Sequence, residues 1–333
     1  MESYSAMINI PLIRCLNQQL ISPQFTKPEE VVSWMGMIQA QDFGAAKMAV
    51  AMRMKCSSIE KALKKVDKAL DEGRIIRIHV SRPTWQLVAA EDVRWMCDLS
   101  RERNARAFAG YCKQAGVEIT PEEYASSFSL IENALKCGHS LTAQELKAVF
   151  AAEGLNTDRM HLTGYIWMAE NRGLICSGKL DGNRSTYALL DERVPDNGPS
   201  YSRKEAVIEL MTRYFKSHSP AKMPDFYWWA GLHPCEASDA LPAIYDDLEN
   251  ELLGLVHKDC RRHGKLKGVR RLLPAFDEYL VGYTARSDVL PDKYKRRCIT
   301  ANGLFFPTIM EEGKIVGTVR KGVEKYFEKK AER

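Results

Sequence analysis

With 333 residues, the chain exceeds what one hydrophobic core usually organises, and two to four modules of ordinary size are expected. Its 45% hydrophobic and 27% charged residues are typical of a soluble globular protein. No stretch is apolar over the length that a bilayer requires, and the N-terminus lacks the basic and apolar regions of a signal peptide. A cytoplasmic location is therefore expected, and the nine cysteines indicate reduced, mostly buried thiols.

The net charge of +5 is mild, but the basic residues cluster. The segment 257–271 carries seven lysines and arginines against one acid, Asp259, and more basic residues follow at 293–297 and from Arg320 onward. Such clusters favour either a polyanionic partner or a solvated basic face. The candidates for contacts with a polyanion in this segment are Arg261, Arg262, Lys265, Lys267, Arg270 and Arg271.

The first block, residues 1–120, has the pattern of helices followed by a hairpin. Apolar periodicity predicts four helices, at residues 11–21, 28–38, 45–54 and 58–70. Residues 74–88 then alternate like strand residues around the Arg82-Pro83 turn, and residues 91–114 return to a helical pattern. Helices followed by a hairpin are typical of a winged helix.

The second block, residues 121–195, repeats this order more clearly. Thr142 and Glu145 have capping-box spacing at the start of a helix, and a further helix over 157–171 ends before Gly173. Residues 174–190 follow as strand, turn and strand, with Asp181-Gly182-Asn183 at the tip. This order over about seventy residues is the winged variant of helix-turn-helix.

The third block, residues 200–263, follows a breaker-rich linker and predicts a degenerate third copy of this module. Its expected elements are helices near 202–216, 221–230 and 235–244 and a strand over 252–257. Residues 264–333 instead combine short strands with tight turns, as a small open or barrel-like β unit does. The predicted fold is thus α+β, mainly α, with three tandem winged-helix modules followed by a small β-barrel-like domain.

Several landmarks resemble those of the AlkZ/YcaQ-like winged-helix DNA glycosylases. The family's glutamine motif, Q-x-Q in one branch and Q-x-D in another, is matched by Met37-Ile38-Gln39-Ala40-Gln41-Asp42. Residues 77–92 resemble its arginine-rich hairpin, and residues 273–280, 302–303 and 313–320 its C-terminal signature. The resemblance covers nearly the whole chain, and only the combination is specific. Val319 departs from the tryptophan usual in the family, and the end at Arg333 predicts a short barrel.

The resemblance implies three winged helices and a β-barrel around a basic channel for double-stranded DNA. It implies hydrolysis of the N-glycosidic bond of N7-alkylated purines, crosslinked ones included, by a nucleoid-associated enzyme. We expect a monomer that needs no membrane and no cofactor. No metal is expected either, because the histidines and the cysteine at 257–263 have no paired cysteine or fourth ligand nearby.

Two glutamines suit this reaction only because the substrate base is already cationic. A neutral amide is a poor general base, but an N7-alkylated purine is a good leaving group. The amide carbonyls of Gln39 and Gln41 can orient water and stabilise a positively charged sugar. Residues spaced i, i+2 share no helical face, so we expect a helix to end near Asp42, a third catalytic candidate as water activator. The alternative is two surface glutamines at a helix end.

Arg77, His79 and Arg82 on the first hairpin are candidates for holding phosphate or inserting beside a lesion, and the alternative is a solvated wing. Asp277 lies in an apolar run, where it can orient a backbone turn, and has no firm role. Three tryptophans are expected in the core, namely Trp85, Trp228 and Trp229.

Three functions remain open at the level of sequence. The first is a monofunctional DNA glycosylase for cationic alkyl-purines. The second is a non-catalytic winged-helix DNA-binding protein, a regulator or lesion binder, whose helix over 157–171 enters a major groove. The third is a protein-interaction scaffold that binds no DNA.

Overall fold

The computed structural model describes residues 9–182, 184–251 and 254–328. The predicted hairpin residue Asn183, the start of the predicted strand at 252–253 and both chain ends lie outside these ranges. About 49% of the chain is helical and 17% is strand, so the fold is mixed α/β. Within the described ranges, no helix is both long and apolar enough to cross a membrane. Six of the nine cysteines are buried, and all nine are free thiols.

The first block folds largely as its periodicity predicts, and Ser58 caps the fourth helix by accepting the Lys61 N–H at 3.2 Å. Its elements are α1 (Ile10–Asn17), α2 (Pro28–Met35), β1 (Ile38–Gln39), α3 (Phe43–Met52), α4 (Ile59–Asp71), β2 (Ile75–Val80), β3 (Thr84–Ala89), the 3-10 helix η1 (Ala90–Asp92) and α5 (Val93–Ala115).

The short strand β1 was not predicted. Gly36, with φ +79°, ends α2, because this backbone conformation favours glycine and cannot continue a helix. Ile38 and Gln39 then pair with Leu87 and Gln86 in a sheet of order β1-β3-β2. The expectation that a helix ends near Asp42 was therefore wrong, since Gln39 lies on the edge of a sheet and a helix begins after Asp42.

The second block contains the predicted helices and hairpin. Thr142 and Glu145 form the capping box, in which the Glu145 carboxylate accepts the Thr142 N–H at 2.7 Å and the Thr142 hydroxyl accepts the Glu145 N–H at 3.3 Å. A short strand, β4, joins the hairpin in a sheet of order β4-β6-β5. The elements are α6 (Pro121–Leu135), β4 (Leu141–Thr142), α7 (Ala143–Ala152), α8 (Arg159–Asn171), β5 (Ile175–Ser177), β6 (Thr186–Leu189) and α9 (Leu190–Arg193).

The third block contains three helices and a two-stranded sheet. Its apolar residues share one core cluster with the first hairpin and with α5, so it packs directly against the first block. The elements are α10 (Arg203–His218), α11 (Met223–Ala230), α12 (Pro234–Ala240), the 3-10 helices η2 (Leu241–Ala243) and η3 (Tyr245–Asp247), β7 (Leu248–Glu251) and β8 (Gly254–His257).

The C-terminal part forms a four-stranded antiparallel sheet of order β12-β11-β10-β9. Among the residues that the structure describes, this sheet stays open and no sheet closes into a barrel. The elements are β9 (Arg270–Leu273), α13 (Glu278–Val281), the 3-10 helix η4 (Asp292–Tyr294), α14 (Lys295–Cys298), β10 (Thr308–Glu311), β11 (Lys314–Arg320) and β12 (Val323–Tyr326).

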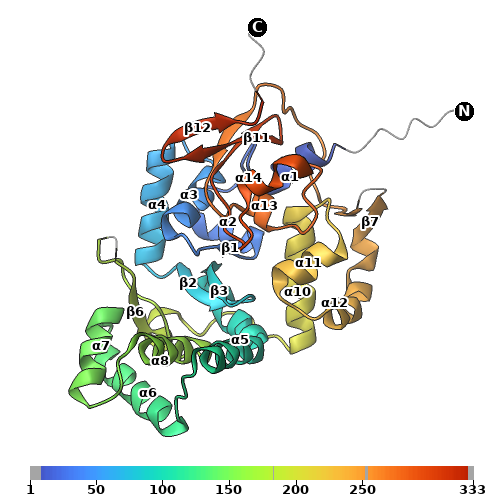
Figure 1. Cartoon of the computed structure of the whole chain (residues 1–333). Helices are drawn as coiled ribbons and strands as arrows, with labels where there is room; N and C mark the ends of the chain where they lie inside the picture. The colour runs from blue at the N-terminus through green and yellow to red at the C-terminus, as the bar shows by residue number, and fades with distance from the viewer. Residues whose placement is uncertain (1–8, 183, 252–253, 329–333) are drawn as a thin grey trace, which may run out of the picture.

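The β2–β3 hairpin occupies the centre of the molecule (Figure 1). Figure 1 shows α1–α4 and the C-terminal sheet above it, α10–α12 to one side, and α5–α8 below. Strand β2 contacts α5, α8 and β5, so the hairpin links the first two blocks. Helix α1 shares a core cluster with the C-terminal sheet, which joins the two ends of the described chain.

A buried ion pair fixes the start of α13. Arg53, directly after α3, donates two hydrogen bonds of 2.8 Å to the carboxylate of Asp277, and both side chains are buried. Burial alone lowers the pKa of Arg53, but the Asp277 charge outweighs it, so the pKa rises. Asp277 also accepts the Tyr279 N–H at 2.9 Å and caps α13. It does therefore orient a backbone turn.

Replacing Arg53 by methionine should destabilise the fold strongly. The substitution leaves the Asp277 carboxylate buried without its cation, which typically costs about 3–5 kcal/mol. Urea denaturation followed by circular dichroism measures this loss. The control is Arg101→Met, which breaks the exposed pair with Asp98 and should cost about 0–1 kcal/mol. Equal losses in the two variants would contradict a structural role for the buried pair.

Candidate functional site around the glutamine motif

The side chain of Gln39 is buried and held in one orientation. Its carbonyl oxygen accepts hydrogen bonds from Arg82 Nη2 at 3.0 Å and from Gln86 Nε2 at 3.4 Å. Its backbone N–H donates to Glu278 Oε1 at 2.8 Å. Because both the main chain and the amide are engaged, Gln39 presents a preformed polar group rather than a mobile surface side chain.

Gln41 and Asp42 are exposed beside it. Between the two glutamines, Ala40 donates its N–H to the Trp85 carbonyl at 2.8 Å. Gln39 is the last residue of β1, and Gln41 lies in the bend between this strand and α3. Asp42 caps α3 through the Ala45 N–H at 2.9 Å, which engages one carboxylate oxygen.

Arg77 lies against the motif, and His79, on the same strand, lies against the second block. Arg77 donates to the Ala40 carbonyl from Nε at 3.1 Å and from Nη2 at 3.0 Å, and burial lowers its pKa. His79 Nδ1 lies 2.6 Å from Glu170 Oε2, and its ring stacks on Trp167 at a centroid distance of 4.4 Å. Arg77 therefore supports the motif and His79 the contact between the first two blocks, in contrast to a solvated wing.

The tip of the first hairpin is docked onto the C-terminal end of α11. The Ser81 hydroxyl donates to the Ala230 and Trp229 carbonyls. Gly231 follows with φ +68°, and a Cβ there would lie 2.9 Å from the Ser81 carbonyl oxygen, so only glycine fits. This docking places Arg82 against Trp228, 4.7 Å from the ring centroid, while it donates to Gln39.

Glu278 is a site residue that sequence reasoning missed. It is fully buried, and its second oxygen accepts the Trp229 indole N–H at 3.0 Å. Burial alone raises the pKa of Glu278, but the His218 imidazole at 3.8 Å, the Gln39 N–H and the Arg82 charge outweigh it, so its pKa falls below the ordinary value. The available signal was a second acid beside Asp277 in an apolar run.

The three tryptophans, all predicted to lie in the core, differ in how deeply they are buried. Trp229 is fully buried, as expected, and Trp85 is partly buried beneath Arg77. Trp228 is 36% exposed, so the core prediction was wrong for this residue. Neighbouring positions on a helix point about 100° apart, and only one of two adjacent tryptophans can face the core of a surface helix such as α11.

The basic segment after β8 is largely engaged within the fold. Lys265 and Lys267 are exposed, whereas its arginines contact neighbouring parts of the chain. These contacts join Arg261 to the Leu16 and Ser22 carbonyls, Arg262 to Glu249, Arg270 to Glu324 and Arg271 to the Leu20 carbonyl. Much of this charge therefore has a structural partner. Within the described ranges, no three histidine, cysteine or acidic side chains gather where a metal ion could bind.

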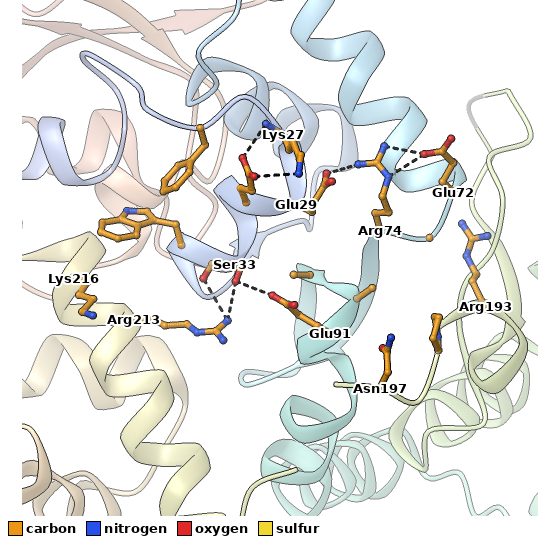
Figure 2. Close-up of a pocket in the computed structure, with 17 residues that line it drawn as sticks. Lys27, Glu29, Ser33, Glu72, Arg74, Glu91, Arg193, Asn197, Arg213 and Lys216 are labelled. Carbon is orange, nitrogen blue, oxygen red and sulfur yellow. Dashed lines mark hydrogen bonds and ion pairs between the residues drawn. The ribbon is translucent and has the colours of Figure 1, made fainter. Parts of the chain in front are cut away.

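A cleft of about 750 Å³ lies apart from the motif, between α2, the start of β2 and the segment after α9. Figure 2 shows that Arg74 points toward Glu29 and Glu72, and that Arg213 points toward the hydroxyl of Ser33. None of its lining residues belongs to the glutamine motif. Three acidic side chains of its lining are paired within it, Glu29 and Glu72 with Arg74 and Glu30 with Lys27.

The glutamine motif thus lies on the edge of the sheet that carries the first hairpin, where Arg77 and Arg82 donate to Ala40 and Gln39. The family model described as DNA glycosylase AlkZ-like matches residues 32–325, and the chain belongs to this family. The solved structure of the Streptomyces sahachiroi DNA glycosylase AlkZ is similar, with a TM-score of 0.73 and 20% identity over 93% of this chain and 87% of that chain. At this identity the likeness concerns the fold. No curated protein matches the chain.

Stability at acid pH should depend on His218, behind Glu278. Burial lowers the pKa of His218 from its ordinary 6.5, so below that pH the unfolded chain binds a proton more readily than the folded one. The free energy of unfolding should then fall as the pH drops from 6.5 toward 5. In His218→Phe, this slope should become shallower by up to one proton, or about 1.4 kcal/mol per pH unit.

Urea denaturation of both proteins between pH 5 and 7.5 measures this slope. Burial also lowers the pKa of His257. Because the wild-type protein and the variant both keep this residue, part of the slope should remain in each. Identical slopes in the two proteins would show that His218 does not control the pH dependence of the free energy of unfolding.

Proposed function

We propose that the protein hydrolyses the N-glycosidic bond of cationic N7-alkylated purines in double-stranded DNA, crosslinked purines included. The observation that carries this proposal is the Gln39 side-chain amide beside the exposed Gln41: Arg82 and Gln86 orient the amide, and Glu278 holds the backbone N–H of Gln39. Membership of the AlkZ-like DNA glycosylase family supports DNA repair as its context. We further propose that it acts as a monomer in the cytoplasm, at the nucleoid.

In the proposed reaction, the bond between the sugar C1′ and the purine N9 breaks, and its electron pair neutralises the purine cation. Water forms the new bond to C1′ from the opposite side. Gln41 orients this water through its carbonyl, while the fixed Gln39 amide positions the nucleotide. The proton of the attacking water passes to the free oxygen of Asp42 or to solvent.

This arrangement limits the substrate to bases that are already charged. A neutral purine leaves only after a general acid protonates it. Among the described residues that contact Gln39, Arg82 keeps its proton at neutral pH and Glu278 has a lowered pKa, so neither supplies one. N7-alkylation supplies the positive charge instead.

We propose that residues 1–120, 121–195 and 200–263 act as three winged-helix modules and residues 264–333 as a small β domain. DNA phosphates contact Arg82, Lys265 and Lys267 directly. The further arginines of the basic segment, Arg261, Arg262, Arg270 and Arg271, add to the positive field. Arg77 acts through the motif that it supports, and His79 through the contact between the first two blocks.

Purified protein should release 7-methylguanine from alkylated duplex DNA, measured by chromatography of the free base. Gln39→Ala and Gln41→Ala should each lower the single-turnover rate by about 10²-fold, the usual effect of losing one preorganised polar group. Gln114→Ala, at the exposed end of α5, is the matched control and should retain the full rate. A folded, DNA-bound wild-type protein that releases no N7-alkyl purine would be a non-catalytic DNA-binding protein instead.

Because the proposed reaction requires a positively charged purine, we expect the protein to act much more slowly on a neutral damaged purine. Duplexes that contain hypoxanthine, a neutral damaged purine, should be hydrolysed at least about 10²-fold more slowly than those with 7-methylguanine, because no group at Gln39 protonates the base. Single-turnover rates on both duplexes test this under saturating protein. Comparable rates on the two substrates would require a general acid that the proposed mechanism lacks.

A further inference from the structure

Two guanidinium groups lie against one partly exposed indole ring beside Gln39. The Cζ atoms of Arg82 and Arg286 are 4.7 Å and 5.4 Å from the centroid of the Trp228 ring, and Trp228 is 36% exposed. The three residues come from the first hairpin, from α11 and from the segment after α13. Tertiary folding alone brings them together.

Neither guanidinium has a carboxylate partner among the residues that the structure describes. Arg82 donates to the Gln39 carbonyl, and its Nε is buried without a hydrogen-bond partner. Arg286 donates only to two carbonyls, of Leu280 at 2.6 Å and Thr284 at 3.0 Å. By contrast, the buried Arg53 forms a full ion pair with Asp277.

The pKa of both arginines is lowered, because no paired counter-charge outweighs their burial. Burial lowers the pKa of Arg82, and it lowers the pKa of Arg286 to about 10, with the nearby Glu278 and Asp225 only partly opposing the shifts. A cation that loses its hydration without gaining an anion is costly. An anionic ligand at this position would remove that cost.

We propose that Arg82, Arg286 and Trp228 form the binding site for one DNA phosphodiester, that of the nucleotide whose base is removed. This inference rests on the proposed function and assigns a role to two residues outside the glutamine motif. A guanidinium has five N–H donors, so both arginines keep donors for phosphate oxygens after their observed contacts. The flat Trp228 ring supports both arginines and presents an apolar surface to the adjoining sugar.

The chemistry favours a phosphate over a stacked base at this site. Two guanidinium groups repel the cationic purine that the proposed reaction requires, whereas they attract a phosphodiester. Because Arg82 also donates to Gln39, a phosphate bound there fixes the register of the backbone relative to the glutamine motif. The site thereby selects which glycosidic bond faces Gln39 and Gln41.

A scan of single neutral phosphates tests this. Duplexes with a tetrahydrofuran abasic analogue, which cannot be hydrolysed, carry one methylphosphonate at each position around it in turn. Wild-type protein should lose about 10-fold or more in affinity at one position next to the analogue, as expected for a charge-assisted hydrogen bond. Arg286→Gln should bind unmodified DNA about 10-fold more weakly and lose the penalty at that position.

Two further variants serve as controls for the scan, one that retains the charge at position 286 and one that removes an arginine elsewhere. Arg286→Lys retains the charge and should keep part of the positional penalty, even if Arg286→Gln folds poorly. Arg101→Gln removes an exposed arginine paired with Asp98 and should leave both the affinity and the scan within about 2-fold of wild type. A wild-type scan with no singular position, or an unchanged scan in Arg286→Gln that is folded, would overturn the proposal.

The scan measures binding alone, so its failure is distinguishable from failure of the proposed reaction. A protein that shows the singular phosphate but releases no alkylated base would retain this site and lose the proposed activity. A protein that releases 7-methylguanine but shows no singular phosphate would retain the activity and lose this site.

Discussion

The buried carboxylate of Glu278 is the interaction on which the geometry of the site depends. One oxygen accepts the Gln39 N–H and the other the Trp229 indole N–H, so one side chain joins the first block, α11 and α13. A carboxylate in this position needs its donors, because an unsatisfied buried charge is costly. The site is therefore coupled to the packing of segments that lie more than 200 residues apart in the sequence.

Neighbouring contacts extend this coupling. The Arg53–Asp277 pair fixes the start of α13 one residue before Glu278, and Ser81 fixes the hairpin tip one residue before Arg82. Both support points are buried and hydrogen-bonded, so they resist small displacements. The orientation of the Gln39 amide consequently depends on the whole fold. Loss of a contact at α13 or α11 would change this orientation.

The sequence predicts most helices of this fold, because apolar periodicity and capping residues such as Ser58 and Thr142 act locally. It does not predict β1, whose two residues are extended only because β3 supplies hydrogen bonds. The motif itself was found by resemblance, but its partner Glu278 was not, since nothing local links residues 39 and 278. Similarly, composition cannot tell which arginines of a basic segment are already paired within the fold.

An apparent conflict remains in the electrostatics of the site. Arg82 binds the carbonyl of Gln39, yet a positive charge there opposes a cationic purine and a positively charged sugar. Glu278 offsets this charge only in part, since Arg82 still has a lowered pKa from burial. On the phosphate proposal, the DNA backbone supplies the remaining negative charge. The same contact would then position the substrate and remove the repulsion, so the site would be electrostatically suited to the proposed reaction only when DNA occupies it.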